Sequence, residues 1–221
     1  MKNGRIAAVF LRDAFCSVLG PGRARSAFDN RAAFGYNGSE NTEGVMKLQA
    51  IFFDRDGTLG NLKDIRFPNT FVPFAGISET FEQLHGMGLK VLIASNQSCI
   101  ARGTDNGYDF AAEFSAYGAD GWFLCPHDAH DGCDCRKPKP GLLLRAAEQY
   151  GLDLKRCIMV GDRWSDMKCG FDAGTRCIFL RNEAATPLPA DDPEKMYWIE
   201  RADAQTDDLR LIPQIVLAWG G

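Results

Sequence analysis

Ile51-Phe52-Phe53-Asp54-Arg55-Asp56-Gly57-Thr58 places two carboxylates, two residues apart, directly after a short apolar run. The apolar run predicts a buried strand, and Asp54 would lie where that strand ends. In an open α/β sheet, ligands bind outside the carboxyl ends of the strands, where a loop can hold a metal ion and a nucleophile against a phosphate. The stretch therefore predicts a site for phosphoryl transfer.

Apolar runs alternate with helical patterns on the C-terminal side of this stretch. They predict strands near 49–54, 89–94, 121–125, 157–161 and 176–180, and helices near 76–87, 108–117, 140–150 and 164–172. This alternation is typical of an α/β fold in which a mostly parallel, Rossmann-like sheet carries helices on both faces. A final amphipathic stretch, Leu209 to Trp219, predicts a terminal helix that packs back on the domain.

The chain has 221 residues, of which 45% are hydrophobic, and this is enough for one sizeable core. Residues 1–45 are rich in Gly, Ala, Arg and Asn and have no sustained period, so we expect a loosely ordered N-terminal extension. Residues 46–221 would form one domain. Met46 leads so directly into the first strand that it is a candidate initiator, with the preceding segment a matter of start-site choice.

Charge and hydropathy exclude several classes of partner. A net charge of −4 and a pI near 5.4 give no broad positive field, which disfavours binding to long nucleic acid. No apolar stretch is long enough to span a bilayer, and Ile6 to Leu11 is too short for a signal peptide. We expect a cytoplasmic monomer that acts on a small phosphorylated metabolite.

The other strand ends carry side chains that suit the same chemistry. They are the run Ser95-Asn96-Gln97-Ser98, Lys137, and the run Gly161-Asp162-Arg163-Trp164-Ser165-Asp166. Asp54 offers a nucleophile and Asp56 a group for proton transfer, while a hydroxyl and an ammonium stabilise the phosphate oxygens. A carboxylate that attacks a doubly charged phosphate is repelled, so a hard cation must bridge them. We expect Mg²⁺ held by Asp54, Asp56 and Asp162.

Four soft or borderline metal ligands lie within one short stretch: Cys125, His127, Cys133 and Cys135. This set suits tetrahedral zinc, and because protein would fill all four positions the metal would be structural. His130 is a rival ligand, ranked below His127 because Cys125-Pro126-His127 mirrors the tight pairing of Cys133-Asp134-Cys135. A disulfide or free buried thiols are the alternatives, and a reducing compartment opposes the disulfide.

Taken together, these motifs resemble the haloacid dehalogenase (HAD) superfamily phosphatases. The resemblance covers Leu48 to about Leu180, with the four motifs in the family's order: Asp54-Arg55-Asp56-Gly57-Thr58, Ser95-Asn96-Gln97, Lys137, and Gly161-Asp162-Arg163-Trp164-Ser165-Asp166. It implies that Asp54 forms an aspartyl-phosphate and that Asp56 protonates the leaving group and then activates water. No inserted cap domain is evident, so the crevice would stay open.

The cysteine stretch and the residues that flank it are also similar to D-glycero-D-manno-heptose 1,7-bisphosphate phosphatases, and to the zinc-loop domain of histidinol-phosphate phosphatase. The first resemblance implies removal of the 7-phosphate of the heptose bisphosphate. It also implies that Arg136 and Arg163 contact substrate, and Arg102 is a third guanidinium near the pocket. Three arginines suit a second phosphate, because a guanidinium binds phosphate through two hydrogen bonds.

Other functions remain open on the sequence alone. Histidinol phosphate or another small metabolite is the alternative substrate, and an open site could admit a nucleic-acid 3′-phosphate. From a different class, the chain could be a catalytically idle, zinc-stabilised binding module. Taken singly, each motif also has an ordinary structural explanation: Asp-Gly pairs form turns, Ser95 and Asp162 could cap helices, and Lys137 could be a solvated charge.

Overall fold

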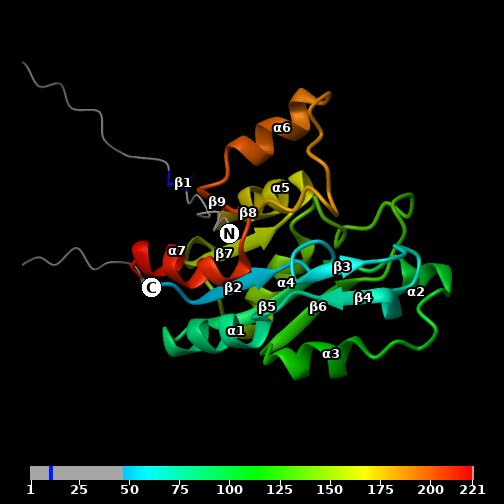
Figure 1. Ribbon diagram of the computed structural model, residues 1–221, viewed down its shortest axis with the longest axis horizontal. Coiled ribbons are helices and arrows are strands. Elements are labelled where there is room, and N and C mark those ends of the chain that lie inside the picture. The colour runs from blue at the N-terminus through cyan, green and yellow to red at the C-terminus, as the bar shows by residue number, and fades with distance from the viewer. Residues whose placement is uncertain (1–9, 12–46, 221) are drawn as a thin grey trace, which may run out of the picture.

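The computed structural model describes residues 10–11 and 47–220 (Figure 1). Its main sheet has the strand order β1-β9-β8-β7-β2-β5-β6. The strands are β1 (Phe10–Leu11), β2 (Ala50–Phe53), β5 (Lys90–Asn96), β6 (Gly121–Cys125), β7 (Cys157–Gly161), β8 (Arg176–Leu180) and β9 (Ala204–Thr206). All neighbouring strands are parallel except β1, which runs antiparallel to β9. A separate hairpin joins β3 (Gly60–Leu62) to β4 (Phe71–Pro73).

The central strand, β2, sets the position of the site. Phe53 at its end is opposite Ile93 of β5 on one side and Val160 of β7 on the other. Because these three strands are parallel and nearly in register, the segments that follow them leave the sheet at the same edge. Asp54, Ser95 and Asp162 are therefore brought together by strand pairing.

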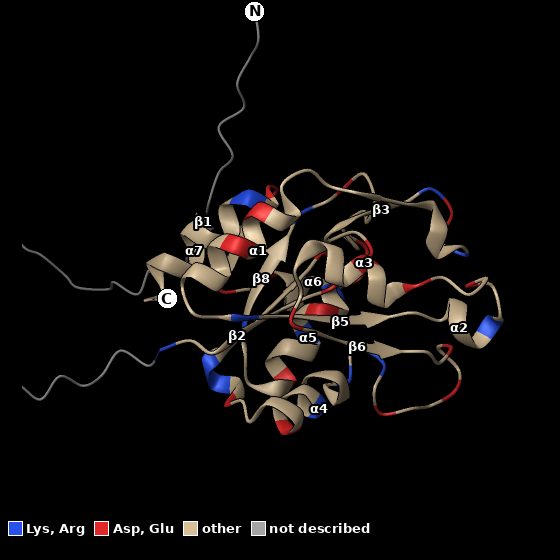
Figure 2. Ribbon diagram, turned by 90° about the horizontal axis from the view of Figure 1, so that it is seen from below, with Lys and Arg blue, Asp and Glu red and all other residues tan. Residues whose placement is uncertain are grey.

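Helices cover both faces of the sheet. The helices are α1 (Ile77–Gly86), α2 (Cys99–Arg102), α3 (Phe110–Tyr117), α4 (Gly141–Tyr150), α5 (Trp164–Ala173), α6 (Pro193–Glu200) and α7 (Ile212–Ala218), with 3₁₀ turns at Pro68–Thr70, Leu154–Arg156 and Leu209–Leu211. Helices α1, α3 and α7 pack with one another on one face, and α4, α5 and α6 on the other. Figure 1 shows β3, β4 and α2 toward one end of the molecule, and Figure 2 shows β3 and α2 at the same end.

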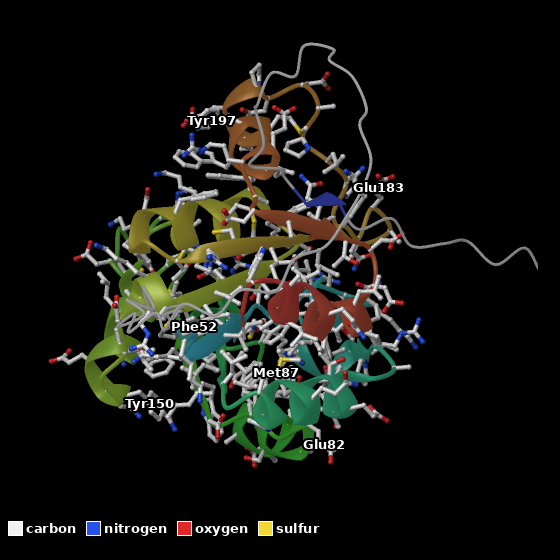
Figure 3. The ribbon with its side chains drawn as sticks, turned by 90° about the vertical axis from the view of Figure 1, so that its left-hand side faces the viewer. Phe52, Glu82, Met87, Tyr150, Glu183 and Tyr197 are labelled. Carbon is white, nitrogen blue, oxygen red and sulfur yellow. The ribbon has the colours of Figure 1, made fainter. Side chains whose placement is uncertain are left out.

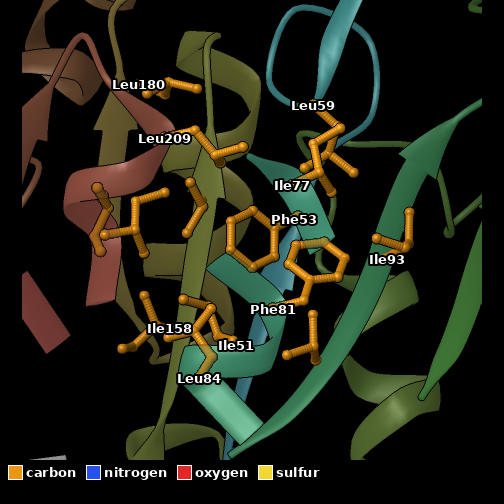
Figure 4. Packing of buried hydrophobic residues seen from close by; sticks show 14 of the residues in the cluster. Ile51, Phe53, Leu59, Ile77, Phe81, Leu84, Ile93, Ile158, Leu180 and Leu209 are labelled. Atoms are coloured by element: carbon orange, nitrogen blue, oxygen red, sulfur yellow. The ribbon is translucent and has the colours of Figure 1, made fainter. Parts of the chain in front are cut away.

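The side chains of β2 alternate between two apolar cores. Ile51 and Phe53 belong to the core under α1, α3 and α7 (Figure 4). There the ring centroids of Phe53 and Phe81 are 5.0 Å apart. Ala50 and Phe52 belong to the core under α4, α5 and α6. Figure 3 shows Phe52 in the interior, whereas Tyr197 on α6 lies at the surface. Burial on both faces fixes this strand and holds Asp54 rigidly at its end.

The five predicted strands and four predicted helices of the central region are confirmed, with boundaries that differ by no more than two residues. The predicted terminal helix is split into a 3₁₀ turn and α7, because Pro213 suits only the first turn of a helix. The predictions missed the β3–β4 hairpin, α2, α6 and β9, which are short. Helix α6 nevertheless carries a start signal: Asp192 caps it and Pro193 begins it.

The prediction for residues 1–45 lies outside the described residues, apart from Phe10–Leu11, which form β1 at the edge of the sheet. No helix in the described part of the chain has the length and apolar character needed to cross a membrane. Acidic and basic segments alternate around the ribbon in Figure 2 and do not gather by sign, as the small net charge suggests.

Candidate active site and cysteine cluster

A pocket of about 310 Å³ opens at the carboxyl edge of β2, β5 and β7. Of the residues predicted to form the site, it is lined by Asp54, Asp56, Asn96, Gln97, Ser98, Arg102, Arg136, Lys137 and Arg163. Ser95 lies directly beneath it, in contact with Asp54. The structure therefore brings together residues from four separate segments of the chain.

Asp54 lies at the centre of this pocket and is held through one of its two oxygens. The Lys137 ammonium is 3.0 Å from Asp54 Oδ1, and the Ser95 hydroxyl donates to the same oxygen at 2.7 Å. Burial would raise the pKa of Asp54, but Lys137 and the Ser95 hydrogen bond outweigh it and lower that pKa. Asp54 is therefore a carboxylate near neutral pH, and no described side chain donates a hydrogen bond to its Oδ2.

Asp56 has the opposite electrostatic environment. Gln97 donates to its Oδ2 at 2.9 Å, and Arg55 donates to its Oδ1 at 2.7 Å. Burial and the nearby charge of Asp54 raise the pKa of Asp56, although Arg55 opposes the shift. The two carboxyl groups, two residues apart, thus have pKa values displaced in opposite directions.

Asp54, Asp162 and Asp166 offer oxygens that all lie within 4.8 Å of one another. Thr58 donates to Asp162 at 3.1 Å, and Thr186 donates to its other oxygen. Burial and the charges of Asp166 and Asp54 raise the pKa of Asp162 to about 7. Of these three buried carboxylates, Asp54 and Asp166 pair with the buried ammonium of Lys137, whereas Asp162 does not.

This arrangement suits a magnesium ion. Mg²⁺ prefers hard oxygen ligands, and a divalent cation would remove the repulsion among the three carboxylates. Gly57 makes room for the cluster: it has a φ of +93°, and a Cβ there would collide with the carboxylate of Asp162. The carboxylate of Asp56, predicted as a third ligand, lies outside this group of three, and Asp166 takes its place in the cluster.

Lys137 is positioned by its backbone as well as its side chain. Its N–H donates to Asn96 Oδ1 at 3.0 Å, and Asn96 Nδ2 donates back to its carbonyl at 3.1 Å. The ammonium also lies 2.7 Å from Asp166 Oδ1. The amide of Asn96 is therefore engaged in holding the loop that presents Lys137.

The four predicted zinc ligands come together at the last residue of β6, Cys125, and in the loop that leads from it to α4. Cys135 Sγ lies 3.2 Å from His127 Nδ1, 3.3 Å from Cys125 Sγ and 3.6 Å from Cys133 Sγ. Sulfurs around a tetrahedral zinc, at about 2.3 Å from the metal, would be about 3.8 Å apart, so the spacing fits this ion. His130 is exposed and lies outside the group.

The three predicted arginines differ in how they are held. Arg136 donates to Ser98 at 2.7 Å and to the carbonyl of His127 at 3.0 Å, which ties it to the cysteine loop. Arg102 is 47% exposed and forms a bidentate pair with Asp128 at 2.6 and 2.8 Å. Arg163 is 40% exposed, and its Nε lies 3.9 Å from Asp162. Arg136 and Arg163 are thus less engaged by carboxylates than Arg102.

Some residues of the site had no predicted role. Asp166 follows Asp162 by four residues in the first turn of α5, and that spacing could have indicated it. Thr186 lies in the connection between β8 and α6, where the sequence gives no signal. Glu113 lies on α3 and, among the described residues, reaches the site through Arg55.

Comparisons with known proteins agree with this geometry. A sequence model of the family described as HAD-hydrolase-like matches residues 134–211. The chain is 37% identical over 148 residues to D-glycero-alpha-D-manno-heptose-1,7-bisphosphate 7-phosphatase of Campylobacter jejuni, covering 62% of this chain and 85% of that protein. It is 36% identical over 170 residues to D-glycero-beta-D-manno-heptose-1,7-bisphosphate 7-phosphatase of Pasteurella multocida, covering 68% of this chain and 90% of that protein.

A solved structure is also similar. The D,D-heptose 1,7-bisphosphate phosphatase of B. bronchiseptica, complexed with magnesium and phosphate, matches with a TM-score of 0.64 and 27% identity, over 77% of this chain and 99% of that one. The shared fold and the two curated relatives point to the same family. The chain therefore belongs to the D-glycero-D-manno-heptose-1,7-bisphosphate 7-phosphatase family of HAD phosphatases.

Proposed function

We propose that this chain is a magnesium-dependent phosphomonoesterase that removes the 7-phosphate of D-glycero-D-manno-heptose 1,7-bisphosphate. The observation that carries the proposal is the pair Asp54 and Asp56, whose pKa values are displaced in opposite directions at the mouth of one strand. Neighbouring carboxyl groups with separated pKa values can divide the roles of nucleophile and acid/base between them. The names of the curated relatives supply the substrate.

Asp54 is the nucleophile in this proposal. Lys137 and Ser95 hold Oδ1, so Oδ2 remains to attack the phosphorus. The bond from phosphorus to the sugar oxygen breaks, and Asp56 gives its proton to that oxygen. Asp56 then accepts a proton from the water that attacks the aspartyl-phosphate, and inorganic phosphate leaves as Asp54 is restored.

Lys137 and Ser95 also stabilise the transferred phosphoryl group in this scheme. The ammonium lies in the pocket beside Asp54, where it can neutralise charge on the phosphoryl oxygens. Asp54, Asp162 and Asp166 would hold Mg²⁺, which supplies further charge neutralisation when bound. Asn96 and Gln97 act through their neighbours: Asn96 holds Lys137, and Gln97 holds Asp56.

The second phosphate of the substrate would be bound by Arg136 and Arg163. Both line the pocket, and neither is fully engaged by a carboxylate. A guanidinium forms charge-assisted hydrogen bonds to phosphate, which favours a bisphosphate over a monophosphate. Arg102 lies in the same pocket but is paired with Asp128, so its contribution should be smaller.

The test is phosphate release by the full chain with Mg²⁺. The panel contains both anomers of the heptose bisphosphate, the corresponding 1-phosphate, histidinol phosphate and a 3′-phosphorylated oligonucleotide. The proposal expects kcat/KM to be highest for one of the two bisphosphate anomers, by about 100-fold or more over the other classes. Equal and low rates on every compound, or a preference for histidinol phosphate, would defeat the sugar assignment.

A further inference from the structure

Arg55, between the two aspartates, has a fully buried side chain in a polar loop. Its guanidinium is 0% exposed, and it does not line the pocket. Burying a charged group is costly unless its hydrogen bonds and charge are satisfied. A guanidinium enclosed at this point must therefore be explained by what it holds.

The guanidinium contacts three segments at once. Arg55 Nε and Nη2 donate to both oxygens of Glu113 on α3, at 2.7 to 3.1 Å, and Nη2 donates to the carbonyl of Pro68 at 3.1 Å. Its remaining nitrogen, Nη1, donates to Asp56 Oδ1 at 2.7 Å. One planar cation thus connects Asp56 to a helix and to the β3–β4 hairpin.

The surroundings of this cation keep it in one orientation. Its central carbon lies 3.9 Å from the ring centroid of Phe71 and 5.2 Å from that of Phe110. Glu113 is only 7% exposed, and Tyr108 donates to its Oε2 at 2.7 Å. A guanidinium stacked on a ring and held by two carboxylates has no other low-energy rotamer available.

Asp56 is consequently held from two sides. Arg55 takes Oδ1 from within the protein, and Gln97, which lines the pocket, takes Oδ2. Asp56 itself lines the pocket, where the leaving group of a phosphate ester would lie. A small rotation of its carboxyl group would change how its proton is presented to that leaving group, and such misplacement is costly for proton transfer.

We propose that Arg55 is a positioning residue, fixed by Glu113, that holds the Asp56 carboxyl group in the orientation needed to transfer a proton to the leaving group. This inference rests on the proposed acid/base role of Asp56. Arg55 does not contact substrate, so its contribution should appear wherever the departing oxygen needs a proton, and Glu113 should contribute only through it.

The leaving group separates this role from a general structural one. The full chain with Mg²⁺ is assayed on phenyl phosphate, 4-nitrophenyl phosphate and the heptose bisphosphate. Nitrophenolate departs with little need for a proton, whereas phenolate and the sugar alkoxide need one. General acid catalysis contributes about 10² to 10⁴-fold. Arg55→Met should lower kcat/KM about 100-fold on phenyl phosphate and the sugar, and less than about 10-fold on nitrophenyl phosphate, with KM within about twofold.

Two further variants keep the test valid if Arg55→Met folds poorly. Arg55→Lys keeps the charge but cannot reach Glu113 and Asp56 together, so it should show the same leaving-group pattern with a smaller loss. Arg55→Met/Glu113→Met replaces the buried pair by apolar side chains and should behave like Arg55→Met.

A third variant tests whether Glu113 acts through Arg55. Glu113→Gln should lower kcat/KM about 10-fold alone and have no further effect when it is combined with Arg55→Met.

The matched control is Arg66→Met. Arg66 also forms a bidentate pair with a carboxylate, that of Asp64, but it is exposed. The variant Arg66→Met should change kcat/KM less than twofold on every substrate. Suppose that Asp56→Asn shows leaving-group dependence but a folded Arg55 variant loses activity equally on both aryl phosphates. That result would overturn the positioning role of Arg55. If Asp56→Asn shows none, the acid/base role of Asp56 fails, and this inference fails with it.

Discussion

The carboxylate site and the cysteine loop both gather metal-binding side chains, but they are built differently. Asp54, Asp162 and Asp166 come from segments after β2 and β7 and from α5, and strand pairing places them together. Cys125, His127, Cys133 and Cys135 come from eleven consecutive residues of one loop. The first site is assembled by the core of the protein. The second has little core of its own, so we expect the metal to organise the loop.

The largest expected effect tests the first site. Asp54→Asn should lower kcat by at least about 10⁴-fold, because a neutral amide cannot attack phosphorus. The substitution removes one of three crowded carboxylates and leaves the cysteine loop untouched, so the fold and one zinc per chain should persist. Steady-state phosphate release and metal analysis measure both. Asp64→Asn, at a partly exposed aspartate outside the carboxylate cluster, is the control. A rate within tenfold of wild type for Asp54→Asn would refute Asp54 as the nucleophile.

The second prediction concerns the cysteine loop. Cys133→Ser should abolish zinc binding and lower kcat/KM about 100-fold, because Arg136 and Lys137 directly follow Cys135 and depend on the loop for their positions. The melting temperature should fall as well. Metal analysis, calorimetry and kinetics measure these effects. His130→Ala, in the same loop, should retain zinc and activity, and a fully active Cys133→Ser protein without zinc would show that the loop is ordered without metal.

A smaller effect should distinguish Arg136 from Arg102, two arginines that line the pocket and also contact the cysteine loop. Arg136→Met should lower kcat/KM for the bisphosphate about 30-fold, which corresponds to about 2 kcal/mol for a charge-assisted hydrogen bond. Arg102→Met should lower it only about threefold, because Asp128 already engages that guanidinium. Neither change should alter hydrolysis of a monophosphate by more than twofold. Equal losses for the two variants would contradict the difference in their contacts.

The smallest expected effect is a pH dependence of stability in metal-free protein. Burial and the charges of Asp166 and Asp54 raise the pKa of Asp162 to about 7 from 3.8. A raised carboxyl pKa means that the folded state binds the proton more tightly, so stability is lost as pH rises from about 4 to 7. Metal-free protein should melt about 5 °C lower at pH 8 than at pH 5. Added magnesium, or the substitution Asp162→Asn, should flatten the dependence of the melting temperature on pH. A melting temperature that rises with pH would disprove the repulsion among Asp54, Asp162 and Asp166.

Much of the fold could be predicted from local patterns. Strands β2 and β7 are fully buried, and β8 is buried after its first residue, Arg176; such strands are visible in a sequence because the buried residues must be apolar. The hairpin of β3 and β4 could not be predicted in this way. It is short and half-exposed, and contacts such as Arg55 with the Pro68 carbonyl hold it in place.

The candidate site shows the same division. Asp54, Lys137 and Asp162 could be named because each follows a predicted strand or lies in a recognisable motif, and the structure places them in one site. Glu113 could not, because within the described part of the chain it is linked to the site through a buried arginine 58 residues away. Thr186 likewise reaches Asp162 from a connection without any regular pattern.

The sequence by itself determined the alternation of the five central strands with the four helices between them, the candidate chemistry of the strand ends and the four candidate ligands of the cysteine loop. These follow from local apolar patterns and from ligands that are close neighbours in the chain. Only the tertiary structure decided which three carboxylates lie together, which residues hold each oxygen of Asp56, and which arginines keep free hydrogen-bonding capacity. Those properties depend on distances between atoms of remote segments, which packing sets and no local pattern encodes.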